Sequence, residues 1–199
     1  MAATAVTSVE RTEDHAPEWS DFTHTGPGTL AGRYMRMFWQ PVYLADDLPA
    51  GRTKPIRIMS EDFTLYRGES GQPHLMAFRC AHRGTQLSTG WVEGDNLRCF
   101  YHGWTYDGSG QCVEQPAEPE PFCSRIKIRS YPVREYLGLI WAYLGEGEPP
   151  PFRRVPQLEA EDELCIAGTI GGGRVLPFNY VNNMENDPGH VPLDRKSVV

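Results

Sequence analysis

The sequence lacks a long hydrophobic run, an excess of basic charge and a secretory leader. Its best apolar stretch, YLGLIWAYLG at residues 136–145, is too short to cross a bilayer, so we expect no membrane partner. With 19 basic and 26 acidic residues the net charge is −7, which removes the electrostatic attraction that nucleic acid or an anionic membrane surface would need. The opening residues, MAATAVTSVERTEDHAPEW, contain no basic stretch followed by an apolar run. These absences favour a cytoplasmic protein.

The number of cysteines is odd, so they cannot all pair in disulfides. An odd number of thiols in a chain without a leader argues against a disulfide framework and favours reduced cysteines, some of which hold metal. The five are Cys80, Cys99, Cys112, Cys123 and Cys165. Cys80 and Cys99 have a histidine two and three residues later. They are therefore the first candidates for metal ligands.

The length of 199 residues allows one complete domain and part of a second. The 20 glycines and 17 prolines indicate many turns and hence a mainly β fold. We expect a flexible arm over residues 1–31 and a β domain over residues 32–148. Three consecutive prolines follow, ending at Pro151, and residues 149–199 then form a linker and the beginning of a second domain.

Alternation of apolar and polar residues predicts strands in KPIRIM, DFTLYR and HLMAFR, between residues 54 and 79, which form an antiparallel meander. Further strands are expected in LRCFYH, IKIRSYPV and LGLIWAYL, between residues 97 and 144. Ahead of them, Tyr34, Met37, Phe38 and Trp39 have helical spacing. This spacing predicts a short amphipathic helix that packs in the core and runs into Pro41.

The pattern Cys-x-His at Cys80 and His82, followed by Cys-x-x-His at Cys99 and His102, predicts a metal site. Each pair stands where a strand-like run gives way to a loop with glycine, so two loop tips can face each other across one ligand. Thiolate and imidazole both suit tetrahedral zinc, but a zinc finger takes its cysteines from one element and its histidines from another. One cysteine and one histidine per loop instead match a Rieske [2Fe–2S] cluster, with the cysteines on the inner iron and the histidines on the outer. Zinc, and buried thiols with structural histidines and no metal, remain as alternatives.

The stretch CAHRGTQLSTGWVEGDNLRCFYHGWTYDGSGQC, residues 80–112, resembles the Rieske domain of the Rieske-type non-haem iron oxygenases. These are the large (alpha) subunits of aromatic-ring-hydroxylating and related oxygenases. The resemblance extends over roughly residues 33–190, and it implies an antiparallel β-sandwich that holds the cluster, followed by an α+β catalytic domain. It also implies a reductase or ferredoxin as electron donor, a small aromatic substrate with O2, and a trimer in which the cluster of one subunit serves the iron of the next.

Three positions separate the chain from the respiratory branch of the Rieske proteins. The family resemblance implies that members of that branch have a disulfide between the two loops and a residue with a hydroxyl group after the second ligand histidine. Here Thr85, Tyr101 and Trp104 stand at those places. Because hydrogen bonds to the cluster raise its potential, within roughly −150 to +300 mV, their absence favours the low end. We expect Gly84 and Gly103 to let backbone N–H groups approach the cluster sulfides. Trp104 either shields one side of the cluster or simply packs in the core.

The resemblance further implies a mononuclear ferrous iron held by two histidines and a carboxylate. The family places the first histidine in a stretch like Asp-Pro-x-His, here residues 187–190. This makes His190 the candidate iron ligand and Asp187 the candidate carboxylate that bridges to the cluster of a neighbouring subunit. The second histidine would follow four or five residues later, where this chain has Asp194 and Arg195. Only part of an iron site is therefore expected in these residues.

Two functions of different classes follow. One is the electron-transfer domain of an aromatic-ring-hydroxylating oxygenase, which passes electrons from a reductase towards mononuclear iron for O2-dependent hydroxylation. The other is a stand-alone Rieske ferredoxin-like carrier with no oxygenase activity. We expect electron transfer to be the chemistry that these residues complete, and no O2-dependent turnover by this chain.

Overall fold

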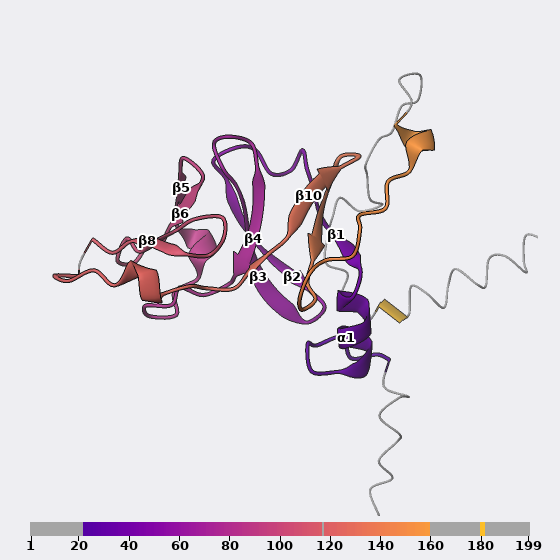
Figure 1. Cartoon of the computed structure of the whole chain (residues 1–199), viewed down its shortest axis with the longest axis horizontal. Coiled ribbons are helices and arrows are strands. Elements are labelled where there is room, and N and C mark those ends of the chain that lie inside the picture. The colour runs from indigo at the N-terminus through magenta and orange to yellow at the C-terminus, as the bar shows by residue number, and fades with distance from the viewer. Residues whose placement is uncertain (1–21, 117, 160–179, 182–199) are drawn as a thin grey trace, which may run out of the picture.

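The computed structural model describes residues 22–116, 118–159 and 180–181. Within them, antiparallel sheets carry most of the regular structure (Figure 1), which confirms the predicted mainly β fold. No helix in this part of the chain is long and apolar enough to span a membrane. The expected start of the second domain lies largely outside the described residues.

The strands form three sheets within the described residues. The first contains, in spatial order, β1 (Trp39–Leu44), β11 (Leu139–Tyr143) and β10 (Val133–Tyr136). The second contains β2 (Thr53–Ile58), β3 (Glu61–Arg67), β4 (Pro73–Ala77) and β9 (Ser130–Tyr131). The third contains β5 (Trp91–Glu93), β6 (Asn96–Arg98), β7 (Thr105–Tyr106) and β8 (Cys112–Glu114). The helical segments are α1 (Leu30–Arg36) and the short 3-10 turns η2 (Leu87–Thr89), η3 (Cys123–Arg125) and η4 (Pro156–Leu158).

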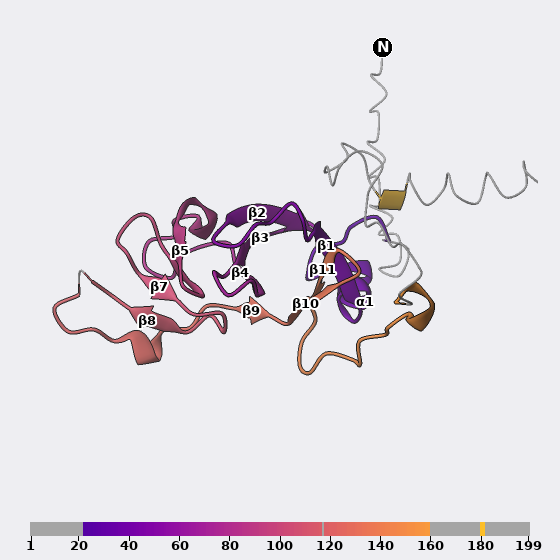
Figure 2. The ribbon, with the colours of Figure 1, turned by 90° about the horizontal axis from the view of Figure 1, so that it is seen from above.

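The second sheet lies between the other two, as the view from above shows (Figure 2). It also separates two hydrophobic cores, because successive side chains of a strand point to opposite faces. On β3, Phe63 and Leu65 face the first core and Tyr66 faces the second; on β4, Leu75 and Met76 divide in the same way. The first core contains Val42, Ala45, Leu48, Ile56, Phe63, Leu65, Leu75, Tyr131, Ile140, Ala142 and Leu144. The second core contains Tyr66, Met76, Cys80, Leu87, Val92, Leu97, Cys99, Trp104, Tyr106, Cys112 and Ile128.

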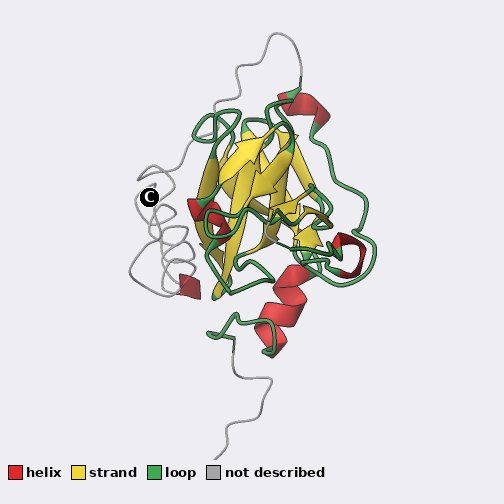
Figure 3. Cartoon of the chain, turned by 90° about the vertical axis from the view of Figure 1, so that its left-hand side faces the viewer, coloured by secondary structure: helices red, strands yellow, loops and turns green. Residues whose placement is uncertain are grey.

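Helix α1, which lies below the sheets in the end view (Figure 3), buries one glycine and one arginine rather than its tyrosine. Gly32 and Arg36 are buried, whereas Tyr34, Met37 and Phe38 are 62%, 59% and 47% exposed. The predicted short helix is therefore present, but the prediction that its apolar residues pack in the core is wrong. The helix ends at Arg36, and β1 begins directly after Phe38.

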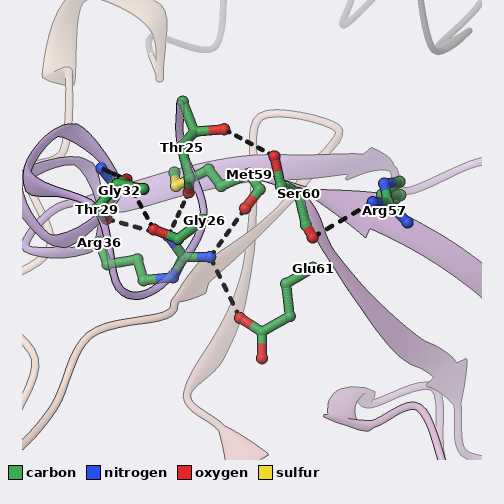
Figure 4. Close-up of polar contacts among 9 residues, drawn as sticks. All are labelled: Thr25, Gly26, Thr29, Gly32, Arg36, Arg57, Met59, Ser60 and Glu61. Atoms are coloured by element: carbon green, nitrogen blue, oxygen red, sulfur yellow. Dashed lines mark hydrogen bonds and ion pairs between the residues drawn. The ribbon is translucent and has the colours of Figure 1, made fainter. Parts of the chain in front are cut away.

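The Arg36 guanidinium joins α1 to two other segments (Figure 4). It donates to the carbonyl oxygens of Thr25 at 2.8 Å and Met59 at 3.0 Å, and it pairs with the Glu61 carboxylate at 3.2 Å. The Thr25 and Ser60 hydroxyls meet at 3.3 Å. Met59 and Ser60 have φ of 47° and 63°, the left-handed pair that a two-residue hairpin turn requires. The chain before α1 is thus held against the β2–β3 hairpin.

Candidate metal centre

Two hairpin loops of the second core are closed by the same pair of hydrogen bonds. In the first loop, the Cys80 N–H donates to the Thr85 carbonyl at 2.8 Å and the Gly84 N–H donates to the Cys80 carbonyl at 3.0 Å. In the second, the Cys99 N–H donates to the carbonyl of Trp104 at 2.8 Å and the glycine N–H donates back to the Cys99 carbonyl at 3.1 Å. The first loop is flanked by an isolated β-bridge and the second by the β6–β7 pairing. The two loops therefore close in the same way, although the histidine follows the cysteine by two residues in the first loop and by three in the second.

Glycine is required in each loop by backbone conformation. Gly84 and Gly103 have φ of 70° and 72°, a left-handed region that other residues rarely adopt. Their N–H groups donate to the cysteine carbonyls. The left-handed turn therefore explains both glycines, and the expectation that backbone N–H groups of these loops approach cluster sulfides stays a prediction.

The four predicted ligands come together between the loops. Cys80 and Cys99 are 3% and 2% exposed, and their thiols lie within hydrogen-bonding reach of each other. His82 and His102 are half-buried, with ring centroids 4.6 Å apart and planes at 61°. The thiols thus form an inner pair in the second core, and the imidazoles form an outer pair near the surface.

The chemistry of these groups fits an iron–sulfur cluster. The Nδ1 atom of His102 is buried and has no hydrogen-bond partner among the described residues, as expected of an atom that binds a metal. Burial, followed by the nearby His102 and Arg83, lowers the pKa of His82, so that its ring is neutral at neutral pH as a ligand must be. Burial raises the pKa of the Cys99 thiol. A thiolate in this place needs a cationic partner, which an iron ion supplies.

Among the described residues, no three His, Cys, Asp or Glu side chains converge closely enough to hold one metal ion. Two irons that each take two protein ligands need no such convergence. The arrangement is therefore compatible with the cluster.

A hydroxyl group that the sequence did not reveal contacts one of these thiols. The Tyr106 hydroxyl lies 3.2 Å from Cys80 Sγ and accepts the Ala81 N–H at 3.1 Å. Since the Ala81 N–H occupies an acceptor position, the hydroxyl proton is free to point at the sulfur. The low potential is predicted because Trp104 carries no hydroxyl group. Tyr106, two residues further along the chain, supplies a hydroxyl from another direction.

Two further thiols lie in or against the same core without histidine partners. Cys112 is 2% exposed and Cys123 is partly buried, and the two thiols are near enough for Cys123 to affect the pKa of Cys112. Burial raises the pKa of Cys112 to about 12, so this thiol stays protonated. All four described cysteines are free. The other predicted site residues, Asp187 and His190, lie outside the described residues, as does Cys165.

Comparisons with known proteins agree with this geometry. Residues 38–132 match the family model of the Rieske [2Fe-2S] domain. The chain is 39% identical over 194 residues to phenoxybenzoate dioxygenase subunit alpha of Ectopseudomonas oleovorans, covering 89% of this chain and 47% of the relative. It is 37% identical over 178 residues to the 5,5'-dehydrodivanillate O-demethylase oxygenase subunit of a Sphingobium species, covering 83% and 40%. The chain thus spans less than half the length of these relatives.

Solved structures show the same relationship. The Pseudomonas putida CBB5 NdmA QL mutant with caffeine aligns with a TM-score of 0.52 and 34% identity, over 56% of this chain and 35% of that one. A fluorene-bound complex of oxygenase and ferredoxin from carbazole 1,9a-dioxygenase aligns with a TM-score of 0.51 and 32% identity, over 58% and 31%. The chain therefore belongs to the Rieske-type non-haem iron oxygenase alpha subunits, and residues 38–132 are its Rieske [2Fe-2S] domain.

Proposed function

We propose that Cys80 and Cys99 hold the inner iron of a [2Fe–2S] cluster, that His82 and His102 hold the outer iron, and that the chain transfers electrons for an aromatic-ring-hydroxylating oxygenase. The observation that supports this most strongly is the pair of loops that close with the same hydrogen bonds. Each loop contributes one buried thiol and one half-buried imidazole to the same site. When bound, such a cluster supplies a reversible one-electron carrier.

The protein gives the site a closed side and an open side. The thiols lie in the second core, where apolar side chains exclude water from the cysteine side. The ring of His102 contacts Tyr101, which is 60% exposed, and the preceding Phe100 is 65% exposed. Electrons then enter and leave at the histidine edge, because only that edge comes near the surface.

We place the electron donor, a reductase or a ferredoxin, at this edge. Exposed aromatic side chains such as Phe100 and Tyr101 are frequent anchors of protein interfaces. Further support comes from the carbazole 1,9a-dioxygenase relative, whose structure is a complex of the oxygenase with its ferredoxin.

The proposal extends to residues beyond the described range. There His190 binds a mononuclear ferrous iron, and Asp187 bridges it to the cluster of a neighbouring subunit in a trimer. The reaction is the O2-dependent hydroxylation of a small aromatic substrate. Support comes from the relatives, which include a dioxygenase alpha subunit and an O-demethylase oxygenase subunit. The predicted limits of the arm (1–31), the Rieske domain (32–148) and the linker with the second domain (149–199) are part of this proposal.

The ligand assignment is tested by cluster content. The purified chain should contain iron and acid-labile sulfide in a 1:1 ratio, with the EPR signal of mixed cysteine and histidine ligation. Cys99→Ser should lose most of the iron, because a serine hydroxyl is a far poorer iron ligand than a thiolate. Cys123→Ser is the matched control, since it removes a thiol that packs against the same core, and it should keep the cluster. Zinc in place of iron, or equal loss of iron in both variants, would refute the assignment.

The electron-transfer role is tested by reduction of the loaded chain. A reductase and ferredoxin pair should bleach the cluster absorbance, and product formation from an aromatic substrate, O2 and added ferrous salt is then measured. Reduction without product is the expected result for this chain and matches the electron-transfer role. Reproducible product formation would show a complete mononuclear iron site, and failure of every donor to reduce the cluster would contradict the role.

A further inference from the structure

Trp104 stacks on one of the proposed ligands. Its indole is parallel to the His82 imidazole, with ring centroids 4.7 Å apart and planes at 6°. The indole is only 2% exposed. Because the two rings lie flat against each other, any large rotation of the imidazole would drive its edge into the indole face. The stack therefore restricts the orientation of His82.

The indole is itself fixed from two sides. Phe122 packs edge-on against it, with centroids 5.6 Å apart and planes at 80°. The Phe122 backbone is held in turn, because its N–H donates to the Gln115 side-chain oxygen at 2.6 Å, and Gln115 is 3% exposed. The backbone carbonyl of Trp104 accepts the Cys99 N–H that closes the second loop. Trp104 thus belongs to the second loop but holds a histidine of the first.

Only His82, of the two histidines, has a buried aromatic ring from the opposite loop stacked on it among the described residues. Thr85 takes the place of Trp104 in the hydrogen-bond pattern of the first loop, since its carbonyl accepts the Cys80 N–H. A threonine offers no ring for His102 to stack on. His102 instead meets Tyr101, which is 60% exposed and tilted by 35°. The two histidines are therefore held by different contacts.

We propose that Trp104 is a positioning residue, which fixes the ring plane of His82 and thereby sets the electronic properties of the outer iron. This inference rests on the proposed function, because it assigns His82 to that iron. The orientation of an imidazole determines how its nitrogen overlaps with the metal, and the flat apolar indole keeps water from that ring face. Trp104 acts through its shape and through stacking, although its buried Nε1 also lacks a hydrogen-bond partner among the described residues.

Two substitutions separate stacking from the indole N–H. Trp104→Phe keeps a flat ring without the N–H, and Trp104→Leu keeps apolar bulk without a ring. In the loaded chain, pulsed EPR of the reduced cluster should show two imidazole nitrogen couplings. Trp104→Leu should change one of these couplings and shift the midpoint potential. It should also shorten the lifetime of the cluster in air by roughly two- to tenfold, because the stabilisation from one aromatic pair is lost. Trp104→Phe should keep both couplings and the lifetime close to those of the parent chain.

Val92→Ala controls for general loosening of the second core, because Val92 is 8% exposed in that core and lies on β5, outside both loops. It should lower thermal stability without changing either nitrogen coupling. Unchanged couplings and potential in Trp104→Leu would overturn the inference, and so would equal changes in both Trp104 variants, which would assign the effect to the N–H. If the parent chain holds no cluster, it is the proposed function that fails, so the two failures are distinguishable.

Discussion

At the scale of the residue, Tyr106 places a hydroxyl group next to the Cys80 sulfur. Burial, together with the adjacent Cys80, raises the pKa of its hydroxyl well above the usual value. The hydroxyl is therefore protonated at neutral pH, and it would be the donor to a metal-bound Cys80 thiolate, whose sulfur lies 3.2 Å away. Reduction adds negative charge to the cluster and its ligands, so a donor in this place stabilises the reduced form.

We therefore expect Tyr106→Phe to lower the midpoint potential of the cluster. A hydrogen bond to a charged group contributes roughly 1.5 to 3 kcal/mol. At about 59 mV per 1.4 kcal/mol for one electron, the decrease should amount to tens of millivolts, with about 130 mV as the upper limit. Protein-film voltammetry or a dye-mediated titration followed by EPR measures it.

Tyr66→Phe is the matched control for this change. Tyr66 is fully buried in the same core, but its hydroxyl donates to the carbonyl of Asp95 at 3.0 Å and contacts no proposed ligand. Its loss should affect stability and leave the potential unchanged. Equal potentials in Tyr106→Phe and the parent chain would show that the hydroxyl does not act on the cluster.

At the scale of the element, Arg98, the last residue of β6, stabilises the second loop through a hydrogen bond to its backbone. The guanidinium donates to the Gly103 carbonyl at 3.1 Å, to the Glu93 carboxylate at 2.8 Å and to Glu114 on β8. Its side chain is 17% exposed, while the two carboxylates are 44% and 49% exposed. The ion pairs are therefore largely screened by solvent, and the bond to the loop carbonyl matters most.

Arg98→Met should lower the free energy of unfolding by about 1 to 3 kcal/mol, because the Gly103 carbonyl and two carboxylates lose a shared charged donor. Urea unfolding measures the change. Arg57→Met removes a comparable pair with Asp62, in which the side chains are 57% and 44% exposed, and it should cost no more than about 1 kcal/mol. Equal costs would mean that the loop contact of Arg98 contributes nothing beyond a surface ion pair.

The elements also show where sequence reasoning succeeds and where it stops. The strands β2, β3, β4 and β11 are five to seven residues long, so their alternation is readable, and they confirm the predictions. The strands β5, β7 and β8 have only two or three residues, too few to show a period, and they were missed. The exposure of Tyr34 and Phe38 was missed because helix packing depends on which neighbours are present, and here the short α1 buries Gly32 instead.

The proposed site follows the same division. The ligand types and their spacing are local in the sequence, so the pairing of two loops could be predicted from the residues alone. The contact between Tyr106 and Cys80 joins residues 26 positions apart, and the stack of Trp104 on His82 crosses from one loop to the other. Such contacts are set by strand register, which the sequence does not reveal for strands of two residues.

At the scale of the whole molecule, the central sheet divides the protein into parts that depend on the cluster to different degrees. All four proposed cluster ligands are carried by loops of the second core, next to the short strands β5–β8. The first core contains none of them, and its strands β1, β10 and β11 are four to six residues long. Because two- and three-residue strands contribute few hydrogen bonds, the third sheet should rely on the cluster for its order.

Removal of the cluster by chelation under reducing conditions should therefore loosen one half of the domain. Amide hydrogen exchange should become about tenfold faster or more at Cys80 and Cys99, whose N–H groups close the two loops, because metal-binding free energy that supports the folded loops is lost. Exchange at Ala142, which pairs with both β1 and β10, should remain within about twofold, since the first core keeps its contacts. A uniform increase in exchange rates across both cores would show that the two halves unfold together and that the central sheet does not keep their unfolding separate. Exchange unchanged everywhere would show that the loops are preformed without iron, in which case the hydrogen bonds that close them are sufficient to hold the ligands in place.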